Sequence, residues 1–424
     1  MIYLKVSFLM DFENFLGKRV LLQMIPFGIF LVLLSGNFVY SASTKTKVLL
    51  GIDVLQKENF ESVKGKRIGL VTNHTGLDSK GKRTVEILKN ASQTKLVALF
   101  APEHGFRGQV EHGMMIADEK DQKTGIPVYS LYGKTKRPTP EMLESLDAVI
   151  FDIQDIGTRF YTYITTLAYM LEECAKKDIE LIVLDRPNPI TGTIVEGEAL
   201  HPGINHFTAY LKVPVRHGMT VGELANWYNR TSHINARLKI IKMEGWKRSL
   251  WWEDTNLRFV PTSPNIRNLE AALLYSGIGA FEATNVSVGR GTKKPFKLLG
   301  APWMDGALVA ERINFFRVSG FKIKKTQFTP KQDLYKGELC QGIEVGVEDK
   351  NSARSFDLFV HLAVILRDYY PDKFILRWEE IERVTGSKEF KTWLEMGHSA
   401  ETILFLVHER AAQFQETVKP YLLY

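Results

Sequence analysis

The stretch LVALFAPEHGFRG, residues 96–108, joins an uninterrupted apolar run to a group of titratable side chains. The run as far as Phe100 has the length and continuity of a strand that is buried on both faces of a sheet. Glu103, His104 and Arg107 then follow among a proline and two glycines. In open parallel sheets, ligands bind beyond the carboxyl ends of the strands, so this stretch predicts both a parallel sheet and a site at its edge.

Short apolar runs alternate with helical patterns on both sides of this stretch. Strands are expected at 67–73, 96–103, 126–132, 148–155 and 181–187, and the segments at 84–90 and 163–177 have helical spacing. Continuous apolar strands that alternate with helices predict a mostly parallel sheet covered on both faces. We therefore expect an α/β domain over residues 47–205.

The chain after residue 205 has a different pattern. Thr220 and Glu223 have capping-box spacing, so a helix is expected to begin there. The strand-like segments LKIIKM, FKIKKTQF and GIEVGVED are mixed with further helical patterns. We expect a smaller α+β domain over residues 206–424, which begins near HPGINHF, residues 201–207.

The N-terminus has the order of parts found in a signal peptide. Lys18 and Arg19 precede the apolar run VLLQMIPFGIFLVLL, and the small residues around Ala42 and Ser43 follow it. A membrane-spanning helix needs about 20 apolar residues, so this run is short, although an uncleaved anchor is the alternative. Residues 1–43 therefore predict export to the periplasm or the extracellular space, with attachment to the inner membrane if the segment is kept.

Charge and cysteine content narrow the class of protein only slightly. The net charge of +7 favours acidic partners such as nucleic acid, anionic lipid or carboxylated glycans, and no Lys/Arg run selects among them. The two cysteines, Cys174 and Cys340, cannot form a disulfide framework, and a single bridge between them is left open.

Several standard chemistries have no support in the sequence. No glycine-rich phosphate fingerprint follows the first strand, so we expect no nucleotide, and neither HExxH nor a Cys/His cluster indicates a metal. No GxSxG elbow indicates a serine hydrolase. The remaining chemistry is centred on carboxylates and needs no cofactor. It fits glycoside hydrolysis, a carbohydrate lyase or a sugar-binding protein without activity.

Polar side chains gather after four of the predicted strands, where a solvated loop would have no reason to be so rich in them. The candidates are Asn73 and His74, then Glu103, His104 and Arg107, then Asp152, Asp155, Arg159 and Tyr161, and finally Asp185, Arg186, Asn188 and Glu196. Each also has a structural interpretation as a turn former, a hydrogen-bonded strand end or a member of an ion pair. Asp185 and Arg186 in particular could pair with each other.

Glu103 is the strongest catalytic candidate of this group. It follows a proline at the end of a hydrophobic strand, so partial burial is expected to raise its pKa and keep a proton available for donation. In the second half, the segment TSPNIRN contributes Asn265, and the loop at 284–303 contributes Arg290 between two glycines. Such a loop could bind an anion such as a carboxylate, or it could be an ordinary basic hairpin.

Eight ordered blocks resemble one enzyme family over about residues 47–424. They are GLVTNHTGLD, LFAPEHGFRG, DIQDIGTRFYTY, LDRPNPITG with VEG, VPVRHGMTVGELA, PTSPNI, VSVGRGTKKPF and GAPW, and they resemble the NamZ-type exo-β-N-acetylmuramidases. The resemblance implies a Rossmann-like domain, a smaller auxiliary domain and an active site in the cleft between them. It also implies the release of N-acetylmuramic acid from the non-reducing ends of peptidoglycan fragments, in cell-wall turnover, with Glu103 as the catalytic glutamate.

Residues and resemblance together predict a mechanism. Glu103 protonates the glycosidic oxygen with His104 and Arg107 orienting it, and Asp152 or Asp155 serves as base or electrostatic stabiliser. The substrate's own 2-acetamido group could act as nucleophile instead. The lactyl carboxylate of muramic acid would be held by arginines, for which the candidates are Arg107, Arg159, Arg186 and Arg290.

Two other functions remain open from the sequence. The chain could bind muropeptides without turning them over, or it could be a lyase that removes the lactyl ether and yields lactate. In each case the expected partners are peptidoglycan-derived glycans, with no nucleic acid and no nucleotide. Contact with a membrane is expected only through an uncleaved N-terminal segment.

Overall fold

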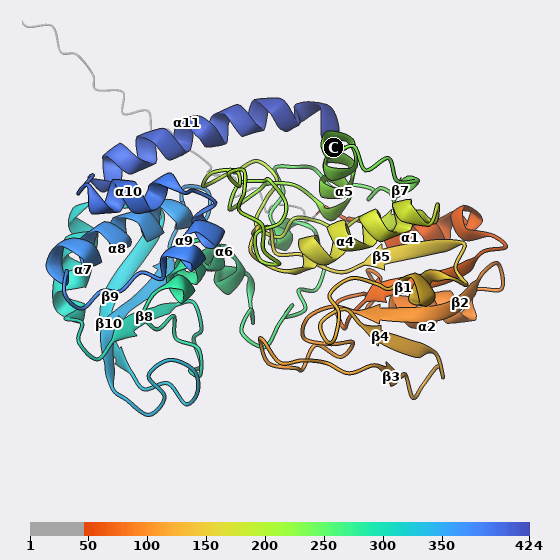
Figure 1. Ribbon diagram of the computed structural model, residues 1–424, viewed down its shortest axis with the longest axis horizontal. Helices are drawn as coiled ribbons and strands as arrows, with labels where there is room; N and C mark the ends of the chain where they lie inside the picture. The colour runs from red at the N-terminus through yellow and green to blue at the C-terminus, as the bar shows by residue number, and fades with distance from the viewer. Residues whose placement is uncertain (1–45) are drawn as a thin grey trace, which may run out of the picture. The chain divides into compact units, whose positions relative to one another are not determined.

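Seven strands form the larger of two sheets in residues 46–424, the part of the chain that this computed structural model describes (Figure 1). Their order across the sheet is β3-β4-β2-β1-β5-β6-β7. All neighbouring pairs are parallel except β3 with β4. The strands are β1 (Arg67–Thr72), β2 (Lys95–Ala101), β3 (Glu119–Lys120), β4 (Pro127–Ser130), β5 (Ala148–Asp152), β6 (Glu180–Leu184) and β7 (Leu238–Ile241).

The predicted α/β sheet is confirmed, with two differences at its edges. The short strand β3 was not expected, because two exposed residues carry no apolar pattern. Strand β7 lies in the segment LKIIKM, which the sequence analysis assigned to the second half, yet it pairs in parallel with β6. Its alternating burial, unlike the continuous burial of β5, explains why it did not look like a strand of this sheet.

Side chains alternate between the two faces of this sheet and are covered by helices on both. Leu70, Leu99 and Ile150 belong to one apolar cluster, together with residues of α1 (Gly51–Lys57) and α2 (Thr84–Asn90). The next residue of each strand (Val71, Phe100 and Phe151) belongs to the other cluster. That cluster includes residues of α4 (Tyr163–Lys176) and α5 (Val221–Thr231), while α3 (Pro140–Leu143) contributes Leu143. Two buried faces explain the continuous apolar strands of the sequence.

A second, antiparallel sheet has the order β8-β10-β9 and packs with the helices of the C-terminal half. Its strands are β8 (Leu298–Ala301), β9 (Phe321–Phe328) and β10 (Cys340–Val347). The helices are α6 (Leu269–Ile278), α7 (Gly306–Phe315), α8 (Ser355–Tyr369), α9 (Trp378–Thr385), α10 (Glu389–Glu395) and α11 (Ala400–Val418). Four 3₁₀ turns complete the elements: η1 (Glu61–Val63), η2 (Trp252–Asp254), η3 (Gly279–Ala283) and η4 (Lys419–Tyr421).

One apolar cluster and the C-terminus connect the two sheets. Phe151 of the larger sheet and Phe359 of α8 lie in the same cluster. Helix α11 runs from the α8 side toward α5 in Figure 1. Beyond it, the Tyr424 hydroxyl donates a 2.7 Å hydrogen bond to Asp185 at the end of β6. The two halves are therefore held together through a shared core and through the end of the chain.

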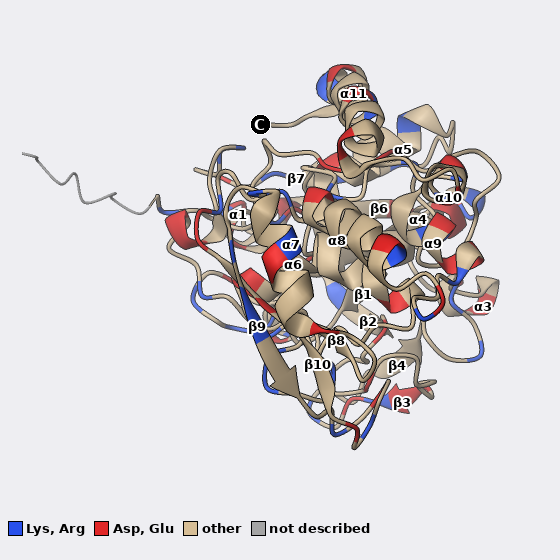
Figure 2. Ribbon diagram, turned by 90° about the vertical axis from the view of Figure 1, so that its left-hand side faces the viewer, with Lys and Arg blue, Asp and Glu red and all other residues tan. Residues whose placement is uncertain are grey.

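The predicted capping box at the start of α5 is present. The Glu223 backbone N–H donates to the Thr220 hydroxyl over 3.2 Å, and the Glu223 carboxylate accepts from the Thr220 N–H over 3.0 Å. Basic and acidic positions are interspersed along the ribbon in Figure 2, as expected from a dispersed basic excess. Within residues 46–424, no helix combines the length and apolar character needed to cross a membrane. The predicted signal segment, residues 1–43, lies outside the described residues.

Candidate active site

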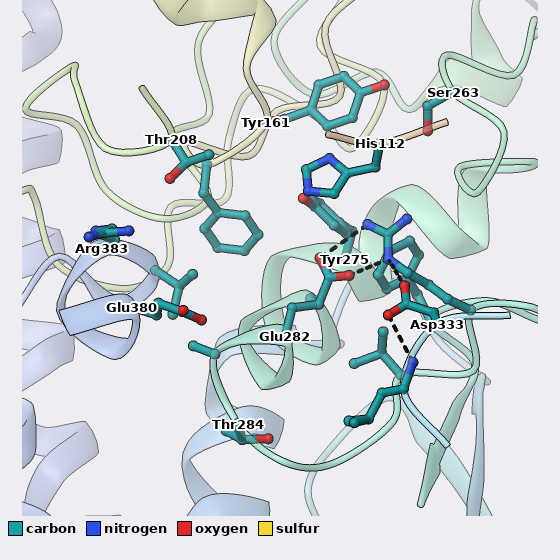
Figure 3. Close-up of a pocket in the computed structure, with 18 of the residues that line it drawn as sticks. His112, Tyr161, Thr208, Ser263, Tyr275, Glu282, Thr284, Asp333, Glu380 and Arg383 are labelled. Atoms are coloured by element: carbon teal, nitrogen blue, oxygen red, sulfur yellow. Dashed lines mark hydrogen bonds and ion pairs between the residues drawn. The ribbon is translucent and has the colours of Figure 1, made fainter. Parts of the chain in front are cut away.

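A cavity of about 470 Å³ lies where the loops after β2 and β5 meet the C-terminal half of the chain. The larger-sheet side supplies Glu103, His104 and His112 from one loop and Tyr161 from the segment before α4. The opposite side is formed by residues of α6, η3, α9 and the loop that contains Arg290. Figure 3 shows His112 and Tyr161 facing Glu282 and Asp333, with Arg383 and Glu380 farther along beside Thr208.

The Glu103 carboxylate is held on both oxygens. Its Oε1 accepts a 2.7 Å hydrogen bond from the His112 Nδ1–H and a longer one, 3.4 Å, from the Gly113 N–H. Its Oε2 accepts a 2.7 Å hydrogen bond from the Thr162 hydroxyl. Only 3% of the Glu103 side chain is exposed. The carboxylate is therefore fixed in orientation at the wall of the cavity.

The expected elevation of the Glu103 pKa is wrong. Burial does favour the neutral acid, but the hydrogen bond and positive charge of His112 outweigh it, helped by the charge of His104 and the hydrogen bond from Thr162. Together they lower the pKa of Glu103 to about 2. Burial alone would raise the pKa of Glu103, but the fold that buries this carboxylate also places His112 against it. Near neutral pH, Glu103 is a carboxylate.

His112 is the most important cavity residue that the sequence analysis missed. It lies 2.7 Å from Glu103, and 54% of its side chain is exposed. The hydrogen bond and charge of Glu103 raise its pKa, although burial opposes them. No apolar run precedes it in GQVEHGMM, so a search of strand ends could not find it. The only available signal was its distance of nine residues along the loop from a candidate glutamate.

Four of the predicted site residues line the cavity, namely Glu103, His104, Tyr161 and Arg290. Arg290 donates hydrogen bonds to both carboxylate oxygens of Glu282, and its Nε lies 3.8 Å from Asp333. Glu282 was not predicted, because it lies in a 3₁₀ turn after α6 rather than at a strand end. It gives the cavity a second carboxylate.

Asp152 does not fit the catalytic role expected for it, because it is completely buried against Arg186. The Arg186 Nε and Nη2 donate to the two carboxylate oxygens of Asp152 over 2.6 and 2.9 Å. The Arg186 Nη2 also donates to the Leu77 carbonyl. Neither residue lines the cavity. The pair joins the ends of β5 and β6, so Arg186 pairs with Asp152 and not with the Asp185 side chain, which was one open interpretation of the sequence.

Asp155 and Asp185 also point away from the cavity lining. Asp155 accepts a 2.6 Å hydrogen bond from the Gly157 N–H and lies 3.4 Å from His217. Asp185 accepts hydrogen bonds from the Thr220 hydroxyl, the Gly222 N–H and the Tyr424 hydroxyl. Burial raises the pKa of Asp185 to about 6 despite these hydrogen bonds. Asp185 fixes the start of α5 and the C-terminus.

Arg159 and Glu196 hold buried backbone rather than substrate. The Arg159 guanidinium donates to the carbonyls of Glu198, Val213 and Val384 over 2.7 to 2.9 Å. Because it is 1% exposed, burial lowers its pKa to about 9. Glu196 pairs with Arg216 over 2.5 Å and accepts from the Phe356 N–H. Neither Arg159 nor Glu196 lines the cavity, so their charges serve the packing of the chain.

The remaining predicted residues shape the loops around the cavity without lining it. Asn73 accepts from the N–H and hydroxyl of Thr75, His74 contacts the Pro261 carbonyl over 2.7 Å, and Asn188 donates to the Met219 carbonyl. Asn265 is buried, whereas Arg107 is exposed. Within residues 46–424, no group of three or more His, Cys, Asp or Glu side chains could hold a metal ion.

The arrangement suits the chemistry of a sugar acetal. A buried carboxylate and the imidazole that contacts it lie on one wall, and a second carboxylate lies on the other. Aromatic side chains, Phe160, Tyr161 and Tyr275, supply apolar surface between them. Two carboxyl groups that flank a cleft are the equipment of glycoside hydrolysis.

Comparison with known proteins identifies relatives over almost the whole chain. Residues 68–270 match the model described as exo-β-N-acetylmuramidase NamZ, N-terminal, and residues 273–424 match the C-terminal model of the same name. The peptidoglycan β-N-acetylmuramidase NamZ of Bacillus subtilis (strain 168) is 42% identical over 381 residues, which cover 90% of this chain and 92% of that protein.

Two crystal structures of DUF1343 family proteins from Bacteroides fragilis NCTC 9343 share the fold. One is 35% identical with a TM-score of 0.83, and the other is 30% identical with a TM-score of 0.72. Each alignment covers 89% of this chain and 99% of the other chain. The chain therefore belongs to the NamZ exo-β-N-acetylmuramidase family.

Proposed function

We propose that this chain is an exo-acting glycosidase that releases N-acetylmuramic acid from the non-reducing ends of peptidoglycan fragments. The observation that carries the proposal is the Glu103–His112 pair, 2.7 Å apart on the wall of a cavity of about 470 Å³, in a chain of this family. A cavity of this volume is at the small end of the usual range for ligand sites, about 300–1,000 Å³. That size suits recognition of a chain end better than of a long strand.

The reaction centre lies between Glu103 and Glu282. Glu103 supplies a fixed negative charge at the wall of the cavity, in direct contact with the imidazole of His112. Glu282, held by Arg290, takes the place that Asp152 and Asp155 were expected to fill as a second carboxylate. A carboxylate in this position stabilises the positive charge that develops on the sugar ring in an oxocarbenium-like transition state.

Arg383 is the best candidate for binding the lactyl carboxylate. The other arginines of the cavity lining are engaged: Arg290 with Glu282, and Arg377 with Glu380 and the Thr284 carbonyl. Among the described residues, the Arg383 guanidinium has only a 3.6 Å contact with a carboxylate of α9 that is 91% exposed. Its donors remain available for a carboxylate, which arginine can bind through two parallel hydrogen bonds.

Residues 1–43 support export as part of the same proposal. Their charged start, apolar core and small-residue end are those of a signal segment. Export would place the enzyme beside its polymer, in the periplasm or outside the cell. Fractionation of cells that express the full chain, with N-terminal sequencing of the exported form, tests this part. A chain that stays in the cytoplasm with its N-terminus intact would contradict it.

The exo mode of action is tested with two sets of defined glycan strands. One set ends in N-acetylmuramic acid at the non-reducing end and the other ends in N-acetylglucosamine. We expect a time course on the first set to release the N-acetylmuramic acid monosaccharide and strands shortened by one sugar, and the second set to be left intact. Internal cleavage of either set would contradict the proposal.

A further inference from the structure

Both members of the Glu103–His112 pair line the cavity, and His112 is the one whose side chain is exposed to it. The Glu103 side chain is 3% exposed and both of its oxygens accept hydrogen bonds, whereas the His112 side chain is 54% exposed. His112 bonds Glu103 through Nδ1, and within residues 46–424 its Nε2 makes no hydrogen bond. The close-up in Figure 3 shows the His112 ring projecting into the cavity.

We propose that His112 is the proton donor of the reaction and that Glu103 acts through it as a positioning residue. The proposal rests on the proposed glycosidase function and names a catalytic residue within the same site. The hydrogen bond to Glu103 fixes the imidazole ring and directs its Nε2–H at the bound glycoside. The carboxylate stabilises the imidazolium form, as an acid that orients a catalytic imidazole does in other enzymes.

The charged groups around His112 favour the protonated ring. Glu103 is in direct contact, and Glu282 on the opposite side of the cavity adds negative charge. The positive charge of Arg290 disfavours the protonated form of His112. His104, which lies in the same loop as His112, has the same effect when it is charged. Burial lowers the pKa of His104, so that ring is neutral near pH 7. The direct hydrogen bond from His112 to Glu103 is the largest influence, and the pKa of His112 is raised.

The backbone conformation of the loop between Glu103 and His112 turns the chain back, so that His112 lies against Glu103. His104 and Gly105 have φ angles of 69° and 76°, in the left-handed region, which turns the chain sharply after the glutamate. Gly108 also has a positive φ, and a Cβ there would lie 1.9 Å from the His74 ring. The His104 Nδ1 and backbone carbonyl both bond Val110, over 2.7 and 3.2 Å. These contacts close the turn immediately before His112.

The step balances as an ordinary hydrolysis. The Nε2–H proton of His112 passes to the glycosidic oxygen while the bond from that oxygen to C1 of the muramic acid breaks and its electron pair stays on the oxygen. Water adds to C1 and releases one proton to solvent, and the neutral imidazole regains one from solvent. Glu103 remains a carboxylate throughout, which agrees with its pKa of about 2.

The test compares two substrates that differ in their need for an acid. In a muramic acid–N-acetylglucosamine disaccharide, the leaving N-acetylglucosamine is a poor alkoxide unless its oxygen is protonated. In the 4-nitrophenyl β-glycoside of N-acetylmuramic acid, the leaving group is a stable phenolate. We expect His112→Gln to lower kcat on the disaccharide by about 10²–10⁴-fold, the usual contribution of a general acid. On the aryl glycoside we expect a loss of less than about tenfold, and the double variant with Glu103→Gln should be no slower than the worse single variant.

The chain provides a matched control in His408. Its Nε2 lies 2.9 Å from Asp357, its side chain is also 54% exposed, and the pair lies between α8 and α11, outside the cavity lining. His408→Gln should keep wild-type kcat on both substrates. Wild-type kcat in His112→Gln, or an equal loss on both substrates, would overturn the inference. So would a leaving-group dependence confined to Glu103→Gln. Wild-type chain that cleaves neither substrate would overturn the proposed function as well.

Discussion

The Glu103 carboxylate is expected to make the stability of the protein steeply dependent on pH in the acid range. Its pKa falls from an ordinary 4.5 to about 2 in the folded protein, so the folded state favours the charged form. A lowered pKa contributes stability that is present above 4.5 and is lost as the pH falls through about 2. The difference corresponds to about 3 kcal/mol in all, of which about 2 kcal/mol is lost by pH 3. At 3% exposure, solvent screening removes little of this.

Glu103→Gln removes the titrating group and keeps the size of the side chain. Its one amide oxygen can still accept from His112, and its amide N–H can donate to the Thr162 hydroxyl. We expect the free energy of unfolding of the wild type to fall by about 2 kcal/mol more than that of the variant between pH 7 and pH 3. Urea unfolding at pH 7, 4 and 3, followed by tryptophan fluorescence, measures both proteins. Parallel pH dependences would contradict this expectation, because they would mean that the folded protein does not favour the charged form of Glu103.

Three other predictions concern stability, specificity and thiols. Asp152→Asn should lower the free energy of unfolding by about 3–5 kcal/mol, because it leaves the buried Arg186 charge without its carboxylate partner. Thermal denaturation checks this. Arg383→Gln should raise KM for the disaccharide about tenfold to hundredfold with kcat nearly unchanged, and should have no further effect on a substrate whose lactyl group is an amide. Cys174 and Cys340 are free and buried, so both thiols should react with a thiol reagent only after the protein is unfolded in urea. Reaction of either thiol in the folded protein would contradict the structure, and so would the absence of reaction after unfolding without a reductant.

The larger sheet was predictable because each central strand is buried on both faces. That burial demands a continuous apolar run, as in AVIF of β5, and such runs stand out in a sequence. The place of strand β7 in this sheet was not predicted, because its alternating pattern occurs in strands of many kinds of sheet. The position of β7 depends on parallel pairing with β6 across more than 50 residues of chain, which no local pattern encodes.

The candidate site was predictable only where it follows a strand. Glu103 was found because it ends β2, but the same rule also selected Asp152, Asp185 and Arg186, whose charges are used to join strand ends. At the edge of a parallel sheet, structural and functional polar residues have the same sequence pattern. His112 was not predicted, because it does not follow a strand directly and is brought to Glu103 only by the conformation of the loop after β2.

The central claim is that this chain hydrolyses the glycosidic bond of muramic acid at a site built on Glu103. Its most direct test is incubation of the purified chain without residues 1–43 with a muramic acid–N-acetylglucosamine disaccharide, followed by mass spectrometry of the products. We expect free N-acetylmuramic acid and free N-acetylglucosamine from the wild type, and a rate lower by about 10²-fold or more in Glu103→Gln. An intact disaccharide, lactate released from it, or equal rates in the two proteins would show that the chain does not work in this way.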